Sequence, residues 1–169
     1  MSEQHAREPL VEFLEGLRDR EDRGPLAALR RALGKPPGGA PEAYPYVVPF
    51  LPRHASAWQE QTYYLVASLF ALHSDGGGRG SLGDVLRNIG QGSSQESAER
   101  RLVLLLGCHP DDLGPHLRHV VSLAKAKQVP VDWRQLMGDL RQWNREDRLV
   151  QRHWARDFWG APIQNETND

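Results

Sequence analysis

The chain has 169 residues, with 21 Lys or Arg against 22 Asp or Glu, a single cysteine and a formal net charge of −1. This length suits one domain, or two small helical halves that share an interface, and it allows a core without disulfide or metal support. Cys108 has no second cysteine to pair with, which favours a reducing compartment, and the near-neutral total charge does not by itself indicate a polyanionic partner.

The N-terminal residues include Glu3 and Glu8 and lack the apolar run of a signal peptide. The longest apolar stretch, residues 63–73, is shorter than the roughly 20 residues that a membrane-spanning helix needs. We therefore expect a cytoplasmic protein with no membrane contact.

Five helical segments are predicted in the first 90 residues. They are expected at 7–22, 25–33, 44–52, 56–73 and 81–89, with the third at most short or broken because it carries three prolines. Loops rich in Gly and Pro separate them at 35–41 and 74–80. Ser56 and Gln59 have the spacing of a capping box. The helix that follows Ser56 is apolar nearly all round, as expected of the most enclosed helix.

Residues 90–92, Gly-Gln-Gly, are expected to separate two halves. We predict an N-terminal helical half at 1–90, a C-terminal helical half with a basic surface at 91–160, and a flexible tail at 161–169. Ser93 and Glu96 fit a second capping box, and Asp132 is expected to cap the penultimate helix. Since no segment alternates with a two-residue period, the predicted fold is all-α, a helical bundle of about eight or nine helices.

The stretch from Val129 to Trp159 separates apolar from basic residues. Its apolar residues recur at helical spacing, as Trp133, Leu136, Met137, Leu140 and Trp143 and then as Val150, Trp154 and Phe158. Its arginines form separate rows, Arg134, Arg141 and Arg145 in one helix and Arg148, Arg152 and Arg156 in the next. Nine basic residues, seven of them Arg, face four acidic ones between Leu113 and Arg156. Because a guanidinium matches phosphate geometry, the rows favour nucleic acid, with a solvated face or a protein interface as the alternatives.

Other chemistry finds little support in the sequence. Residues 78–83 match G-x-G-x-x-G but follow a helix instead of a strand, so an inter-helix loop is the better interpretation than nucleotide binding. Neither His116 with His119 nor Cys108 with His109 has the spacing of a common zinc site. Nothing near Cys108 indicates an activated thiol, and no paired carboxylates stand out. We therefore expect no catalytic residue, no metal site and no cofactor.

Several short motifs, in order, resemble the CasB family, the small subunit of the type I-E CRISPR interference complex Cascade. The resemblance covers roughly Gly24 to Trp159. It rests on the motifs at 26–32 (LAALRRA), 70–73 (FALH), 97–101 (SAERR), 117–119 (LRH) with 122–123 (SL), 130–133 (PVDW) and 154–159 (WARDFW).

This resemblance implies a non-catalytic helical subunit that sits as a pair in an RNA-guided complex. Its implied partners are a second copy of itself, the backbone and large subunits, the guide RNA and the target DNA, with the displaced DNA strand among the contacts. The basic positions inside the matched motifs are Arg30, Arg31, Arg100, Arg101, Arg118 and Arg156. Helical spacing adds Lys125, Arg134, Arg141 and Arg152 as candidate nucleic-acid-binding residues. The alternatives are a purely structural scaffold subunit without nucleic-acid contact and, with less support, a nuclease.

Overall fold

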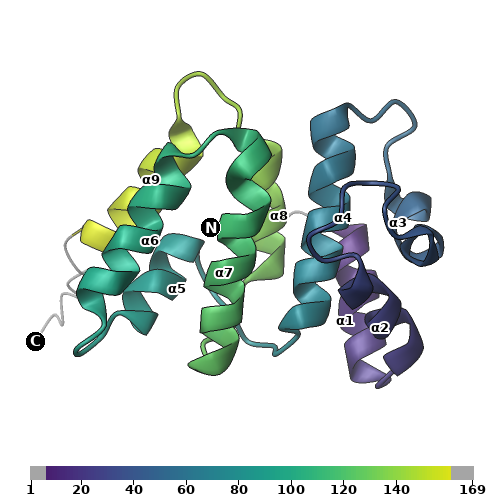
Figure 1. Ribbon diagram of the computed structural model, residues 1–169, viewed down its shortest axis with the longest axis horizontal. Coiled ribbons are helices and arrows are strands. Elements are labelled where there is room, and N and C mark those ends of the chain that lie inside the picture. Colours follow the sequence, from purple (N-terminus) through teal and green to yellow (C-terminus); the bar gives the residue numbers. More distant parts are fainter. Residues whose placement is uncertain (1–6, 161–169) are drawn as a thin grey trace, which may run out of the picture.

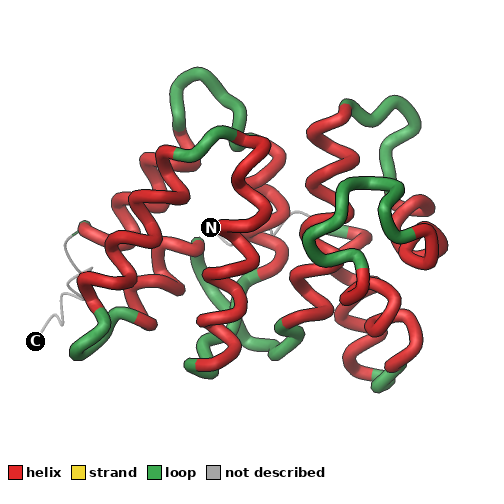
Figure 2. Tube along the Cα trace, in the orientation of Figure 1, coloured by secondary structure: helices red, strands yellow, loops and turns green. Residues whose placement is uncertain are grey.

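The computed structural model describes residues 7–160, and this part of the chain is helical and contains no strand (Figures 1 and 2). The α-helices are α1 (Pro9–Asp19), α2 (Arg23–Arg31), α3 (Tyr44–Val47), α4 (Ala57–Leu72), α5 (Leu82–Ile89), α6 (Gln95–Gly107), α7 (Leu113–Ala126), α8 (Trp133–Arg141) and α9 (Leu149–Trp159). Short 3-10 turns lie at η1 (Pro41–Ala43), η2 (Val48–Phe50) and η3 (Pro110–Asp112). The all-α prediction is confirmed. The predicted tail at 161–169 lies outside the described residues.

Helix α4 lies at the centre of the N-terminal part of the fold. Its side chains at Val66, Ala67, Leu69 and Phe70 are fully buried. They are enclosed because α1 and α2 pack against α4, and α7 and α8 contact it from the other half of the molecule (Figure 1). The predicted capping box is present: the Gln59 N–H donates to Ser56 Oγ, and the Ser56 N–H donates to Gln59 Oε1.

Helix α5 packs closely against α9, and glycine makes that approach possible. A Cβ placed on Gly83 would lie 2.2 Å from the carbonyl oxygen of Trp154 in α9. A Cβ on Gly78 would meet the backbone of Val131 at the same distance. The G-x-G-x-x-G motif therefore has a packing role here, in agreement with its interpretation as an inter-helix loop.

The packing of α5 bears on how the chain divides. Helix α5 contacts α6, α7 and α9, all of which follow residue 90. One continuous hydrophobic cluster runs from Leu10 in α1 to Phe158 in α9. The division at residue 90 remains a prediction, and the packing groups α5 with the helices that come after it.

The helix starts in the second half agree only partly with the sequence. The capping box predicted at Ser93 and Glu96 is wrong, because α6 begins after Ser94 and no side chain caps it. Asp132 does cap α8, since its Oδ1 accepts from the Gln135 N–H at 3.0 Å. Ser81 is an additional cap: it accepts from the Gly83 N–H and donates to Asp157 in α9 at 2.6 Å.

Candidate nucleic-acid interface

The ten predicted basic residues lie on α2, α6, α7, α8 and α9, and they fall into two classes. Four form ion pairs with carboxylates, namely Arg31, Arg100, Arg134 and Arg141. The other six form no ion pair with any residue between 7 and 160, namely Arg30, Arg101, Arg118, Lys125, Arg152 and Arg156. All of these six are exposed except Arg101, which is half-buried.

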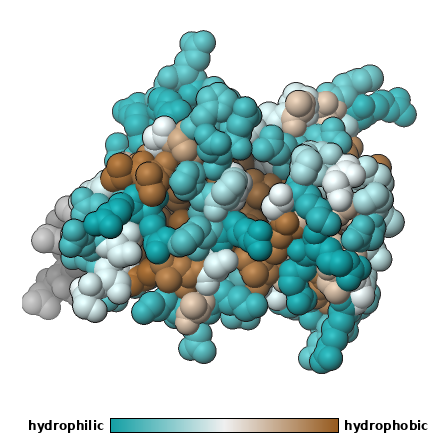
Figure 3. Space-filling model, in the orientation of Figure 1, coloured by the Kyte–Doolittle hydropathy of each residue, from teal (hydrophilic) through white to brown (hydrophobic). Residues whose placement is uncertain are grey.

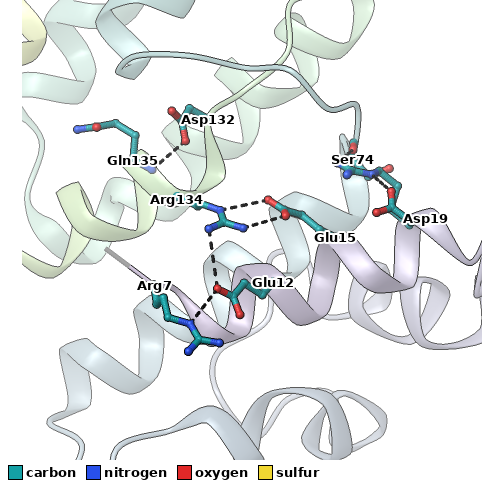
Figure 4. A network of polar contacts seen from close by, with 9 residues as sticks. Arg7, Glu12, Glu15, Asp19, Ser74, Asp132, Arg134 and Gln135 are labelled. Atoms are coloured by element: carbon teal, nitrogen blue, oxygen red, sulfur yellow. Dashed lines mark hydrogen bonds and ion pairs between the residues drawn. The ribbon is translucent and has the colours of Figure 1, made fainter. Parts of the chain in front are cut away.

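Arg134 connects α8 to α1 (Figure 4). Its Nη2 donates to Glu15 Oε2 at 3.1 Å, and its Nη1 lies 3.9 Å from Glu12 Oε1. Arg7 reaches the same Glu12 oxygen from 3.5 Å. The hydrogen bond to Glu15 raises the pKa of Arg134 above its usual value.

Arg141 is held more tightly, by a carboxylate that is almost completely buried. Its guanidinium donates to both oxygens of Glu8, with the Nη2–Oε2 bond at 2.7 Å, and it also donates to the Tyr63 hydroxyl at 3.1 Å. The Glu8 side chain is only 4% exposed. Burial on its own lowers the pKa of Arg141, but the bonds to Glu8 and Tyr63 outweigh it and raise the pKa. Arg134 and Arg141 thus join α8 to α1, and their contact with nucleic acid remains a prediction.

Arg31 and Arg100 form ion pairs of a different kind. Arg31 Nε lies 3.3 Å from Glu42 Oε1, and Arg100 Nη2 lies 3.5 Å from Glu96 Oε1 one helical turn away. All four side chains are well exposed. Solvated pairs of this type contribute little to stability, so either guanidinium can exchange its carboxylate for a phosphate at small cost.

The structure brings the end of α2 together with Arg118 of α7. A Cβ on Gly34 would lie 3.1 Å from Arg118 Nη1, which places that guanidinium against the loop after α2. Lys35 follows in the same loop, and Lys35 and Arg31 both act on Glu42, whose pKa is lowered first by a backbone hydrogen bond and then by these cations. Lys35 was not among the predicted site residues. Helical spacing could not have identified it, because α2 ends at Arg31 and Lys35 lies in the loop that follows.

The remaining candidate basic residues lie further along α7 and on α6 and α9. Lys125 follows Arg118 by two turns of α7, so both side chains point to the same face and lie about 10 Å apart along the helix. Arg152 and Arg156 are one turn apart on α9 and both are exposed. Arg101 of α6 has a buried Nε without a hydrogen-bond partner. No hydrogen bond or ion pair in the described part of the chain joins Arg101, Arg152 or Arg156 to Arg118.

Three features besides the basic residues bear on function, namely candidate metal ligands, the apolar length of the helices, and Cys108. Between residues 7 and 160 there is no group of three or more His, Cys, Asp or Glu side chains placed to hold a metal ion. No helix in this range is both long and apolar enough to cross a bilayer. Burial raises the pKa of the Cys108 thiol, and its Sγ donates to the Leu105 carbonyl at 3.4 Å. A protonated, hydrogen-bonded thiol is a poor nucleophile.

Comparison with known proteins gives a consistent set of relatives. Residues 25–159 match the family described as CRISPR-associated protein Cse2. The CRISPR-associated protein Cse2 of Thermus thermophilus is 39% identical over 146 residues, which are 83% of this chain and 81% of that protein. The crystal structure of CasB from Thermus thermophilus has a TM-score of 0.75 and is 34% identical, covering 92% of this chain and all of the other. A chain in a CRISPR RNA-guided surveillance complex has a TM-score of 0.78 at 30% identity, covering 92% of this chain and 91% of that one.

Proposed function

Because the chain belongs to the Cse2 family of CRISPR-associated proteins, we propose that it is the small, non-catalytic subunit of a cytoplasmic RNA-guided surveillance complex, Cascade. Family membership confirms the resemblance to CasB that the sequence motifs suggested. The proposed protein partners are the backbone and large subunits and a second copy of this chain. Similarity to a chain of a CRISPR RNA-guided surveillance complex supports this assignment.

The proposed activity is to hold nucleic-acid backbone through basic side chains. The observation that carries it is that six of the ten predicted basic residues form no ion pair within residues 7–160, and five of these are exposed, although Arg152 also acts electrostatically on Asp147. An unpaired surface guanidinium or ammonium binds phosphate without first breaking an ion pair, and it releases counterions from the strand. The proposed ligands are the guide RNA–target DNA assembly and, in particular, the displaced DNA strand.

Such contacts matter because strand exchange is nearly balanced in energy. Pairing between guide and target forms a heteroduplex about as stable as the DNA duplex that it replaces. A few phosphate contacts to the displaced strand therefore shift the balance towards the open state. In this mechanism base pairing reads the sequence, and this subunit acts only on the lifetime of the open state.

The test compares two sets of five alanine substitutions in the assembled complex. One set removes the exposed residues that form no ion pair within residues 7–160, namely Arg30, Arg118, Lys125, Arg152 and Arg156. The control removes five other exposed basic residues, Arg20, Arg23, Arg53, Arg79 and Lys127. For single-stranded DNA, the first set is expected to lower the slope of log affinity against log salt by about 0.7 for each residue that contacts phosphate. The control set is expected to leave that slope and the R-loop lifetime unchanged.

Equal salt slopes for the two sets would overturn the nucleic-acid contact, because both remove the same charge from the molecule. Both variants lose five positive charges, so a difference between their salt slopes reports only where the removed residues lie. Incorporation of each variant into the complex is measured first, since a variant that does not assemble says nothing about the strand.

A second function, a protein scaffold without nucleic-acid contact, is favoured by exposed apolar side chains. Val103 and Leu104 of α6 are 54% and 51% exposed, and Trp159 of α9 is 46% exposed. Figure 3 shows apolar surface over the upper part of α6 on this face of the molecule. Exposed apolar groups of this kind mark protein contacts. If the scaffold role is the only one, the five-alanine variant assembles normally and holds the R-loop as the natural chain does.

A further inference from the structure

We propose that a pocket between the two halves of the molecule binds a single unstacked nucleotide of a nucleic-acid strand. The pocket has a volume of about 450 Å³ and lies where the end of α2 and the loop after it meet α4 and α7. Figure 3 shows apolar surface in this seam between α7 and α4. The inference rests on the proposed function and adds to it a defined place for a base.

The walls of the pocket are mostly apolar or aromatic. Leu33 and Pro36 line it from the α2 side, and Tyr64 and Leu65 line it from α4. Behind Tyr64 the ring of Tyr44 packs edge-on at 6.2 Å, which fixes the orientation of the Tyr64 ring. Sites of about 300–1,000 Å³ with such walls hold small organic ligands, so the size of this pocket suits a group such as one nucleotide. Stacking on these walls is open to any base, because every base has a π-face.

Two cations stand at the same pocket. Arg118 and Lys35 are both among its lining residues, and neither forms an ion pair within residues 7–160, although Lys35 also acts electrostatically on Glu42. The lining includes one acid, Asp111, which is exposed and whose carboxylate lies 3.5 Å from His109 Nδ1. An apolar cavity with unpaired cations at its edge matches a nucleotide, whose base is uncharged and whose phosphate is anionic.

A polar group that can read a base edge is also available. Gln61 of α4 lines the pocket, and its side-chain amide makes no hydrogen bond within the described residues. Amide side chains pair with the Watson–Crick edges of unstacked bases. An apolar or aromatic side chain from a protein partner would fill the same walls, but it would bring no anionic group to Arg118 and Lys35 and no polar partner to Gln61. A nucleotide brings both.

The experiment fills the pocket without changing its charge. Gly114 of α7 lines the pocket, and a Cβ there would make an ordinary contact at 3.8 Å with Leu65 Cδ1, so Gly114→Phe places a ring in the cavity. Gly107→Phe is the matched control, because Gly107 is an exposed helical glycine with no atom within 4 Å of its Cβ position. Thermal unfolding of both variants shows that each is folded before binding is measured.

The probes are oligothymidylate of about 12 nucleotides, within the site size of single-strand binding proteins, and an abasic strand of the same length. Binding of both strands to the full chain is measured by fluorescence anisotropy over a range of salt. We expect Gly114→Phe to weaken oligothymidylate binding at least about fivefold, which is the lower end of the contribution of one stacked base. Its salt slope and its affinity for the abasic strand are expected to match those of Gly107→Phe.

One outcome would overturn the proposal: equal binding of oligothymidylate by Gly114→Phe and Gly107→Phe, which would show that no base enters the pocket. If Gly114→Phe then also fails to enter the complex, the pocket is assigned to a side chain of a protein partner. This result leaves the proposed phosphate contacts intact, because those are tested separately by the salt slope of the five-alanine variant.

Discussion

Arg141 of α8 donates to both carboxylate oxygens of Glu8, which lies 133 residues earlier at the start of α1. Arg134 repeats the arrangement with Glu15, at a separation of 119 residues. Each helix therefore presents its two charges seven residues apart, and the pairs match in antiparallel order. This double ion pair joins α1 to α8.

Replacing Arg141 with Met is expected to destabilise the protein by about 3 kcal/mol, because it leaves the Glu8 carboxylate buried without a partner. That value is at the lower end for a buried pair, since the Arg141 side chain is itself 34% exposed. Urea denaturation gives the free energy of unfolding of both proteins.

The double variant Glu8→Gln with Arg141→Met removes the stranded charge and is expected to recover most of that loss. It also separates stability from binding. If Arg141 contacts nucleic acid as the sequence predicted, the double variant binds single-stranded DNA more weakly than the natural chain. If Arg141 serves only to hold α1, its affinity is unchanged.

Gly83→Ala is expected to destabilise the protein by about 2 kcal/mol, the cost of overpacking a close contact. The new Cβ would lie 2.2 Å from the Trp154 carbonyl oxygen, so α5 and α9 must move apart. Gly138→Ala in α8 is the control, because nothing lies within 4 Å of its Cβ position. Because Gly138 lies inside a helix, replacing it by Ala is expected to raise the free energy of unfolding by about 1 kcal/mol. Changes of opposite sign in the free energy of unfolding, measured by thermal or urea denaturation, would verify the prediction. Two decreases of equal size would contradict it.

Asp139 gives the stability a defined pH dependence. Burial is the largest influence on the Asp139 carboxyl and raises its pKa. Two hydrogen bonds lower the pKa, one from the Trp154 indole N–H to Oδ2 at 2.7 Å and one from the Gln135 amide to Oδ1 at 2.9 Å. The charge of His153 also lowers the pKa, and that of Asp157 raises it. A carboxyl with a higher pKa in the folded state binds more protons there than in the unfolded state. The contribution of Asp139 to stability is therefore present at low pH and lost as the pH rises through the folded-state pKa.

Asp139→Asn removes this titration and keeps an acceptor for Trp154. Relative to the natural chain, the variant is expected to become more stable as the pH is raised from about 4, the unfolded pKa of Asp, to neutrality. Free energies of unfolding at several pH values across that window give the measurement. A difference between the two proteins that does not vary with pH would show that Asp139 has the same pKa in both states.

Val103 and Leu104 test the protein-contact role on α6. Changing both to Ser is expected to alter the free energy of unfolding of the isolated chain by no more than about 0.5 kcal/mol, because exposed side chains away from special features have small effects. Incorporation into the complex is expected to fall. Normal assembly of this variant would remove α6 from the candidate protein interfaces.

The sequence predicted the helices well because buried helices repeat their apolar residues every three to four positions, as in Trp133, Leu136 and Leu140. Asp132 and Ser56 were predicted as caps from local spacing alone, and both are confirmed. The prediction for Ser93 was wrong because a capping sequence shows only that a residue is able to cap a helix. The turn at residues 91–94 determines where α6 begins. The ends of a helix are therefore predictable from its sequence to within about one turn.

The candidate site was less predictable because it depends on which helix faces which. Spacing placed Arg134 and Arg141 on one face of α8, but not opposite the glutamates of α1. The seven-residue separation of Glu8 and Glu15 was a usable signal for that pairing. No local pattern could show that Arg118 reaches the loop at Gly34, since this contact exists only when α7 packs beside α4.

The enclosure of α4 also constrains how the chain folds as it is synthesised. The Trp58 indole at its start donates to the carbonyl of Leu140, and the Phe70 ring near its end packs edge-on against Trp133. Both partners belong to α8, which leaves the ribosome only after most of the chain has been made. Until α8 has been synthesised, the N-terminal helices therefore expose the apolar face that α8 will cover. Folding of this half is late because it depends on a segment distant in the sequence. A ribosome stalled before residue 133 would hold an incomplete core, and such nascent chains are expected to be sensitive to proteases until translation resumes.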